Sequence, residues 1–315
     1  MAASKSSSGL TLTILGCGTM GIAISSGIMR ALEELKNSSS PPADTPPRLP
    51  NRIIACVRRE ESGKKIQSVL GSYDTALEIS INENVRAVEA ADVILLGCKP
   101  YMAQSILSES GMRNALRGKL LISILAGTPV EGVETAICGG SYGTYPTDLP
   151  HVVRVMPNTA GFVRESMTVI AASNPPLPEE WNKLVEWMFG RIGPVVTLLP
   201  HLMDAATSLC GSGPAFAALF MEGLADGGVA MGIPRAEAQI MAAQVLKGTA
   251  GLVAAGEHPA VLREKVSTPG GCTIGGLLVL EEGAVRGTVA KAVREATVVA
   301  SKLGVEGTKN VNAPR

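Results

Sequence analysis

Short apolar runs alternate with amphipathic stretches over the first two hundred residues. Runs rich in Val, Ile and Leu predict strands, and stretches with a period near 3.6 predict helices. The expected strands span residues 10–15, 53–57, 77–80, 93–98, 120–125, 152–156, 168–172 and 194–199. The expected helices span residues 20–35, 60–70, 85–90 and 179–189. This alternation predicts an α/β fold with a doubly wound, parallel sheet.

After residue 200 the pattern becomes helical throughout, and no further strand is evident. Helices are expected over residues 204–231, 234–255, 260–266, 273–281 and 285–302. The chain therefore divides into a sheet domain over residues 10–199 and an all-helical domain over residues 200–305. Residues 1–9 are expected to form a disordered tail and residues 306–315 a loose one. The Ser/Pro-rich residues 37–50 are expected to form an exposed loop.

Composition narrows the function classes. Of the 315 residues, 46% are hydrophobic, the formal net charge is zero and aromatic residues make up 3%. A basic surface and stacking aromatics are therefore missing, and we expect no nucleic-acid partner. The six cysteines form no CxxC pair and there are three histidines, so we expect no metal site and a reducing compartment. No targeting or membrane-spanning pattern is evident, which predicts a cytoplasmic protein with no membrane partner.

The clearest chemical motif of the first domain directly follows its first expected strand. Residues 16–21 read GCGTMG and lead into a helix. Glycines at this point allow a tight turn and let backbone N–H groups approach a pyrophosphate at the helix N-terminus. We therefore predict a Rossmann-type nicotinamide dinucleotide site formed by Gly16, Cys17, Gly18, Thr19, Met20 and Gly21.

Two arginines follow the second expected strand, where an NAD-specific site usually has an acidic residue. Arg58 and Arg59 suit the 2′-phosphate of NADPH better than a neutral ribose diol. We predict NADPH as the cofactor, with NADH as an alternative. The intervening loop leaves open which arginine is involved, and a solvated basic loop is the competing interpretation.

Small or polar residues also follow three other expected strands. They are Cys98, Lys99 and Pro100; Ala126 and Gly127; and Pro157 and Asn158. The carboxyl ends of parallel strands meet at one edge of a sheet, where open α/β folds bind ligands. Each cluster alone is equally typical of an ordinary turn, but together they indicate a ligand-binding edge.

The most distinctive segment of the helical half is a Gly-rich loop that leads into a helix, with Thr273 near its N-cap. Free N–H groups at such a helix start can bind a carboxylate or a phosphate. A capping turn between two helices is the alternative. We predict a site for a small-molecule substrate at Val266, Ser267, Gly270, Gly271, Cys272 and Thr273.

Several segments, in the same order, resemble the pyrroline-5-carboxylate reductase family. The segment PAVLREKVSTPGGCTIGGLLVLE, residues 259–281, agrees with the family's signature position by position. RVMPNTAGFVRESMT, LCGSGPAF, ADGGVAMGIPRAEA and GEHP are also similar to the family, and the resemblance extends from about residue 12 to residue 303. It implies a Rossmann domain followed by a helical domain that intertwines with a second copy, as a homodimer or larger homo-oligomer. The implied activity is NAD(P)H-dependent reduction of 1-pyrroline-5-carboxylate to L-proline, the last step of proline biosynthesis.

The resemblance also implies residue roles. It places cofactor contacts at residues 16–21, Asn84, Lys99–Pro100, Ala126–Gly127 and Pro157–Asn158. It places the substrate carboxylate at Gly271, Cys272 and Thr273, and makes Thr273 the catalytic candidate, as the hydrogen-bond partner of the imine. The insertion of residues 37–50 departs from the family pattern, and Cys272 stands where the family often has Ala or Thr.

Three other functions compete with this one. An imine reductase that acts on another ring size is the hardest to separate from it. A β-hydroxyacid dehydrogenase would require a catalytic lysine on a Gly-rich helix, and the pattern around Lys247 does not match that requirement. A non-enzymatic NADP sensor is disfavoured by the intact PGGCT loop.

Overall fold

The computed structural model describes residues 9–139 and 149–303. Contacts divide the chain into two compact units: residues 1–211 together with 297–315 form the first, and residues 212–296 form the second. The predicted tails lie outside the described residues, apart from Gly9. The predicted domain boundary after residue 199 stays a prediction.

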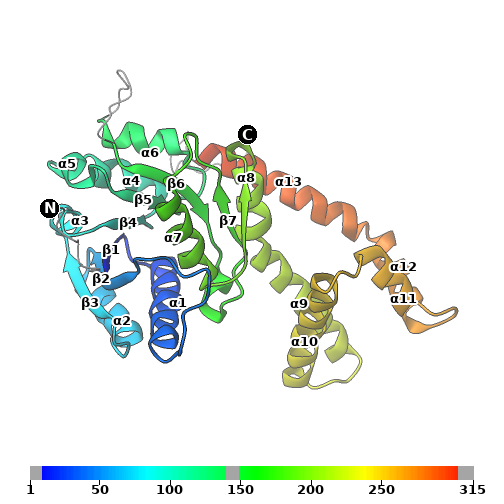
Figure 1. Cartoon of the computed structure of the whole chain (residues 1–315). Helices are drawn as coiled ribbons and strands as arrows, with labels where there is room; N and C mark the ends of the chain where they lie inside the picture. The colour runs from blue at the N-terminus through cyan, green and yellow to red at the C-terminus, as the bar shows by residue number, and fades with distance from the viewer. Residues whose placement is uncertain (1–8, 140–148, 304–315) are drawn as a thin grey trace. The chain divides into compact units, whose positions relative to one another are not determined.

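A mixed sheet forms the centre of the first unit (Figure 1). Its strands are β1 (Leu10–Leu15), β2 (Pro50–Val57), β3 (Ala76–Ile81), β4 (Val93–Leu96), β5 (Leu120–Ser123), β6 (His151–Met156), β7 (Thr168–Ala171) and β8 (Val195–Leu198). The spatial order is β3-β2-β1-β4-β5-β6-β7-β8. All neighbours are parallel except β6 and β7. The prediction of a parallel sheet is wrong at β7, because residues 157–167 are fewer than the roughly dozen residues that a parallel crossover needs.

Helices cover both faces of this sheet. One hydrophobic cluster joins the sheet to α1 (Thr19–Lys36), α2 (Glu60–Leu70) and α7 (Glu179–Gly190). A second cluster joins the opposite face to α3 (Asn84–Glu89), α4 (Pro100–Leu107), α5 (Met112–Leu116) and α6 (Val130–Ile137). This arrangement confirms the doubly wound α/β fold.

The sequence pattern missed α4, α5 and α6. These helices have eight, five and eight residues. A helix of one or two turns shows only a weak period, so the pattern found the equally short α3 but missed these three. The strands β4 and β5 also end two residues before their predicted ends, so Cys98 and Leu125 lie beyond the ends of their strands.

The helical stretch after β8 is broken where a single helix is predicted over residues 204–231. A short turn η2 (Pro200–Leu202) leads into α8 (Met203–Ala206), a π-helical turn η3 (Thr207–Gly211) and then α9 (Gly213–Ala230). Pro214 lies in the first turn of α9 and has no N–H to donate to a preceding turn. A new helix therefore begins there.

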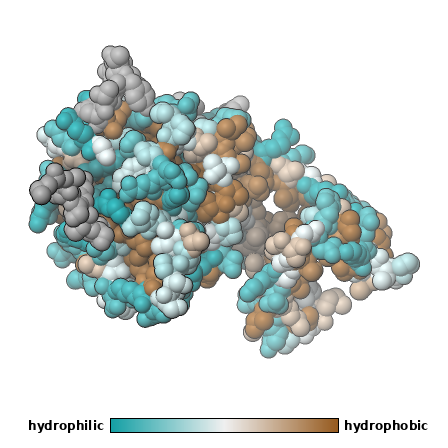
Figure 2. Space-filling model, in the orientation of Figure 1, coloured by the Kyte–Doolittle hydropathy of each residue, from teal (hydrophilic) through white to brown (hydrophobic). Residues whose placement is uncertain are grey.

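The second unit consists of helices. They are α9, α10 (Arg235–Ala254), α11 (Pro259–Val266), α12 (Cys272–Glu282) and most of α13 (Val285–Leu303), which ends in the first unit. Helices α9 and α10 pack on each other through a small cluster around Ala225, Ala238 and Ala242. Hydrophobic side chains elsewhere on these helices reach the surface (Figure 2).

Candidate active site

The GCGTMG loop lies at the carboxyl end of β1, which is flanked by β2 and β4. The chain order reverses at this point of the sheet, and open α/β sheets bind their ligands there. Gly16 has φ +79°, and a Cβ on it would lie 2.7 Å from the Cα of Cys98. Open space surrounds Gly18, because a Cβ on it would have no atom of the described chain within 4 Å. Gly16 therefore permits the tight turn beside Cys98, and Gly18 leaves room for a pyrophosphate to approach the backbone of the loop.

The N-terminus of α1 is open to an anion. Gly18 is the N-cap, no side chain caps the helix and its first turn has no acidic residue. The N–H of Ile22 donates to the carbonyl of Gly18 at 2.9 Å, so the N–H groups of the preceding helical residues have no acceptor within the helix. Burial, with a smaller contribution from Cys56, raises the pKa of the Cys17 thiol to about 12. The thiol therefore stays neutral and does not repel a bound anion.

Arg58 and Arg59 lie in the turn between β2 and α2 and are exposed. Arg59 is the N-cap of α2, and the amide of Asn82 donates to the carbonyl of Arg58 at 3.3 Å. Among the described residues neither guanidinium has an ion-pair partner. Their charge is thus available to a phosphate, although Glu60 and Glu61 follow in the first turn of α2.

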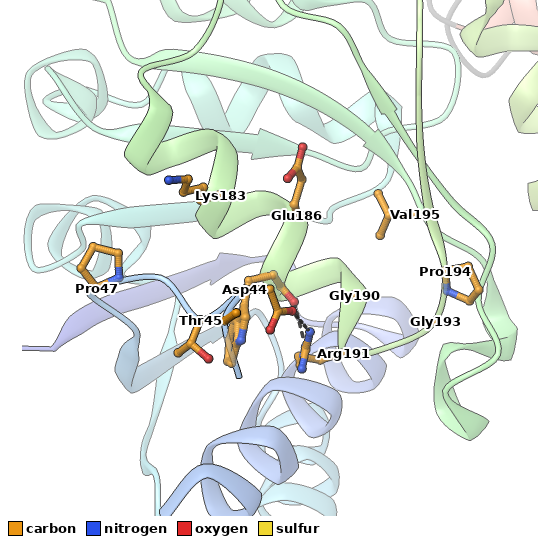
Figure 3. Close-up of a pocket in the computed structure, with 12 residues that line it drawn as sticks. Asp44, Thr45, Pro47, Lys183, Glu186, Gly190, Arg191, Gly193, Pro194 and Val195 are labelled. Carbon is orange, nitrogen blue, oxygen red and sulfur yellow. Dashed lines mark hydrogen bonds and ion pairs between the residues drawn. The ribbon is translucent and has the colours of Figure 1, made fainter. Parts of the chain in front are cut away.

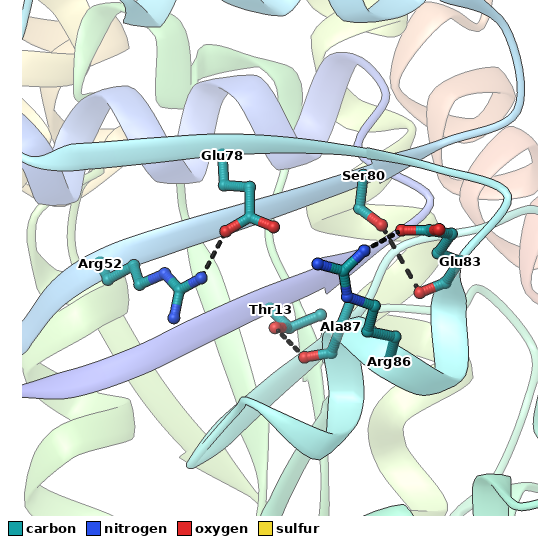
Figure 4. A network of polar contacts seen from close by, with 7 residues as sticks. All are labelled: Thr13, Arg52, Glu78, Ser80, Glu83, Arg86 and Ala87. Carbon is teal, nitrogen blue, oxygen red and sulfur yellow. Dashed lines mark hydrogen bonds and ion pairs between the residues drawn. The ribbon is translucent and has the colours of Figure 1, made fainter.

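Polar contacts fix α3 beside β1 and the end of β3 (Figure 4). The buried hydroxyl of Thr13 donates to the carbonyl of Ala87 at 2.9 Å, and Arg86 pairs with Glu83 at 2.9 Å. Asn84 is the first residue of α3 and donates its amide to Glu109 at 2.8 Å. The helix start that carries Asn84 is therefore held in place at the ligand-binding edge.

The remaining predicted cofactor residues follow β4, β5 and β6, which are parallel neighbours. Cys98 is buried, and burial raises the pKa of its thiol to about 11. Lys99 is the exposed N-cap of α4, and Pro100 is the first residue of that helix. Ala126 is half-buried, and Gly127 adopts φ +68°. The structure thus brings these three clusters to one edge of the sheet in the first unit.

Asn158, after β6, is largely committed to the protein itself. Its side-chain oxygen accepts from the N–H of Ala160 at 3.0 Å, and its side-chain nitrogen donates to the carbonyl of Cys210 at 2.9 Å. Its backbone N–H donates to the hydroxyl of Ser166 at 3.0 Å. A direct cofactor contact through this side chain stays a prediction.

The Gly-rich loop of the second unit joins α11 to α12. Gly270 has φ +69°, and Gly271 is the N-cap of α12. Thr273, predicted near the cap, is the second residue of the helix, which begins one residue earlier than predicted. No side chain caps α12, and its first turn has no acidic residue. The N–H groups of Cys272 and Thr273 therefore have no acceptor within the helix.

Other groups of this loop are engaged. The N–H of Gly271 donates to the carbonyl of Thr268 at 3.1 Å, and the hydroxyl of Ser267 donates to the carbonyl of Arg263 at 2.8 Å. Val266 is exposed and Thr273 is half-buried. The groups of this loop best placed to meet an anion are therefore the N–H groups of Cys272 and Thr273, with the Thr273 hydroxyl beside them.

A cavity of about 750 Å³ lies between the Ser/Pro-rich insertion and α7 (Figure 3). Arg191, just after α7, donates to Asp44 of the insertion at 2.8 Å and stacks over Trp187. None of the predicted cofactor or substrate residues lines this cavity. The insertion, expected as an exposed loop, is thus tied to the body of the first unit by an ion pair that the sequence pattern did not reveal.

Two further features concern the described residues as a whole. They contain no group of three or more His, Cys, Asp or Glu side chains arranged to hold a metal ion. None of their helices combines the length and apolar character needed to cross a membrane.

Comparison with known proteins identifies the family. A family model described as pyrroline-5-carboxylate reductase dimerisation matches residues 200–303, and one described as NADP oxidoreductase, coenzyme F420-dependent, matches residues 11–127. The pyrroline-5-carboxylate reductase of Lophium arboricola is 59% identical over 99% of this chain and 98% of its own length. The chain belongs to the pyrroline-5-carboxylate reductase family. The resemblance deduced from the motifs is therefore confirmed, and the chain is an oxidoreductase.

Other relatives agree. The pyrroline-5-carboxylate reductase of Neurospora crassa is 57% identical over 99% of this chain and 98% of its own length. The crystal structure of Plasmodium falciparum pyrroline carboxylate reductase with NADP bound has a TM-score of 0.74 and 26% identity, and covers 94% of this chain and 98% of that one. The fold thus supports a Rossmann-type unit that takes a nicotinamide cofactor, followed by a helical unit.

Proposed function

We propose that this chain reduces 1-pyrroline-5-carboxylate to L-proline with NADPH, in the last step of proline biosynthesis. The main support for this reaction is the similarity to pyrroline-5-carboxylate reductases over nearly the whole chain. The open N-terminus of α12, with Thr273 in its first turn, carries the assignment of the substrate site. The first turn of α12 has no acidic residue, so its free N–H groups can bind a small anionic ring without the help of a buried arginine.

The cofactor is assigned to the edge of the first unit. Residues 16–21 hold the pyrophosphate, and Arg58 or Arg59 holds the 2′-phosphate. The remaining contacts are assigned to Asn84, Cys98, Lys99, Pro100, Ala126, Gly127, Pro157 and Asn158. The glycine turn at Gly16 and the free charge of the two arginines support this assignment. A bound nicotinamide supplies the hydride.

The substrate is assigned to the loop before α12. The N–H groups of Cys272 and Thr273, with Gly271 beside them, bind the carboxylate, while Val266, Ser267 and Gly270 shape the loop. The hydroxyl of Thr273 hydrogen-bonds the imine nitrogen. An alcohol is too weak an acid for efficient proton donation at neutral pH, so the imine binds protonated or draws its proton from water through Thr273. Positioning and charge stabilisation then supply most of the rate acceleration.

A second copy of the chain is the proposed partner. Ile240 on α10 is 70% exposed and Leu278 on α12 is 58% exposed, which is costly for apolar side chains in water. A Cβ at Gly223, Gly227 or Gly248 would meet no atom of the described chain within 4 Å, although glycine costs about 1 kcal/mol in a helix interior. Packing against another subunit explains both features, and the match to a dimerisation family supports it.

We also place the protein in the cytoplasm. The cysteines are unpaired in the described residues, which agrees with a reducing compartment. The location of a fluorescent fusion in cells tests this assignment.

The activity test uses the purified full-length chain. Oxidation of NADPH is followed by absorbance with pyrroline-5-carboxylate as substrate, and L-proline is identified by mass spectrometry. The six-membered cyclic imino acid and unsubstituted pyrroline serve as comparison substrates. We expect the five-membered carboxylated ring to have the highest kcat/KM. A higher value for the larger ring would favour an imine reductase of another specificity, and a higher value for unsubstituted pyrroline would remove the role of the α12 N-terminus.

A further inference from the structure

A buried arginine on β6 has no role in the proposed binding of cofactor or substrate. The side chain of Arg154 is 6% exposed and donates to the carboxylate of Asp204 at 2.8 Å. Its Nε has no hydrogen-bond partner among the described residues. Asp204 lies in the first turn of α8, at the start of the segment of residues 203–211. A buried guanidinium with one partner is costly to desolvate, so Asp204 is needed to compensate it.

Asn158 holds the other end of the same segment. It is 8% exposed, and its side-chain nitrogen donates to the carbonyl of Cys210 at 2.9 Å. The N–H of Ala160 fixes its side-chain oxygen, so the amide cannot rotate freely. Arg154 of β6 therefore binds the segment at Asp204, and Asn158, just after β6, binds it at Cys210.

The segment needs such contacts because part of it is π-helical. Residues 207–211 form a π-helical turn, a geometry that is rare and occurs often at functional sites. Met203 and Ala206 pack in a cluster with Met156 of β6 and with residues of β7. Ala126, one of the proposed cofactor residues, packs against this cluster. The segment is thus built onto the cofactor edge of the sheet.

The chain enters the second unit directly after this segment, at Ser212. We infer that Arg154 and Asn158 are positioning residues for the reduction, which hold residues 203–211, the last segment of the first unit before Ser212, at the cofactor edge. This inference rests on the proposed function. Neither residue needs to touch substrate or transfer a proton in this role.

Three variants of the full-length chain test the inference. Asp204→Asn removes the charge that compensates Arg154, and Asn158→Ala removes the hydrogen bond to Cys210. Asp44→Asn is the matched control, because Asp44 accepts from Arg191 at 2.8 Å in the same unit, away from the segment. We expect kcat to fall about 10²-fold in both test variants, the scale for a misplacement of about 1 Å. The Kd for NADPH, from fluorescence titration, should stay within about twofold in Asp204→Asn and in the control.

Hydrogen–deuterium exchange provides a readout besides activity. Amides of residues 203–211 should exchange faster in the test variants, while those of β1 and β2 stay unchanged. Faster exchange with unchanged kcat would overturn the inference. So would a loss of NADPH affinity in Asp204→Asn that matches its loss of kcat, because this variant would then act through cofactor binding. If Asp204→Asn does not fold, Asn158→Ala decides by the exchange of residues 203–211 together with kcat at saturating NADPH. A wild-type chain that does not reduce pyrroline-5-carboxylate would instead refute the proposed function.

Discussion

At the residue scale, two glycines of one loop have different physical roles. Gly16 adopts φ +79° and leaves no room for a Cβ beside Cys98, whereas Gly18 has φ −93° and open space around it. Gly16→Ala should lower the free energy of unfolding by about 1–3 kcal/mol, the cost of a left-handed non-glycine residue, and more if the clash persists. Gly18→Ala should change it by less than about 0.5 kcal/mol but weaken NADPH binding, because the methyl group occupies the approach to the phosphates.

Urea unfolding and NADPH titration of the two variants check this pair of expectations. A stable Gly16→Ala variant would mean that the loop can relax away from Cys98. Unchanged NADPH affinity in Gly18→Ala would remove the pyrophosphate from this loop.

The two arginines after β2 carry the prediction of cofactor preference. Their charges have no ion-pair partner in the described chain, so a 2′-phosphate is a suitable one. Replacing Arg58 and Arg59 by Ala should raise the KM for NADPH about 10- to 100-fold, which corresponds to about 1–3 kcal/mol for a charged hydrogen bond. The KM for NADH should stay nearly constant. An equal rise for both cofactors would show that the arginines do not recognise the 2′-phosphate.

The cysteines should differ widely in reactivity. Burial raises the pKa of Cys17 and Cys56 to about 12 and that of Cys98 to about 11, and only the thiolate reacts with iodoacetamide. At pH 8 the thiolate fraction of these three groups is minute. It rises with pH and reaches one half at the pKa of each thiol. Exposed Cys272 should therefore be labelled first, as peptide mass spectrometry can establish. Labelling of Cys17 before Cys272 would contradict the buried, neutral state.

At the element scale, exposed apolar helix faces predict the assembly. Ile240 and Val245 of α10 are 70% and 58% exposed. Ile240→Asp should place a charge in the proposed subunit interface and shift the protein toward monomers, as measured by sedimentation velocity, with loss of activity. Val69→Asp on α2 is the control, because Val69 is also exposed but lies in the first unit. If Ile240→Asp sediments like the wild type, α10 lies outside the interface.

Most elements could be predicted from the sequence, because they are long or strongly apolar. β1 and α2 have the predicted bounds, and the remaining strands differ by at most three residues at either end. The helices α4 to α6 were not predicted, because five to eight residues show only a weak period; the pattern was sufficient for α3 and α11, which are equally short. The direction of β7 and the π-helical turn at residues 207–211 depend on packing between distant segments, which no local pattern encodes.

The same limit applies to the site. Motif spacing placed the glycine turn at Gly16 and the helix start at Cys272 correctly to within two residues. It could not show that Asn158 holds Cys210, or that Gly271 already donates to Thr268, because these are contacts between particular side chains and carbonyls. The ion pair between Arg154 and Asp204 joins residues 50 positions apart and left no local signal.

At the scale of the whole molecule, the two units divide the work of one proposed reaction. We propose that the first unit binds a dinucleotide with an uncapped helix start and with two arginines that have no ion-pair partner among the described residues. The second offers an uncapped helix start with one hydroxyl to a small anionic imine. In the proposed mechanism the chemistry needs no histidine, cysteine or carboxylate as a catalyst, and depends on the position of the Thr273 hydroxyl.

The kcat/KM of Thr273→Val with pyrroline-5-carboxylate tests this claim most directly. Loss of the hydroxyl should lower it about 10²–10³-fold, the scale for one preorganised donor, while NADPH affinity and folding persist. Thr273→Ser, which keeps the hydroxyl, should retain most of the activity. A Thr273→Val variant with wild-type kcat/KM would contradict the role of this hydroxyl and transfer the imine contact to another group.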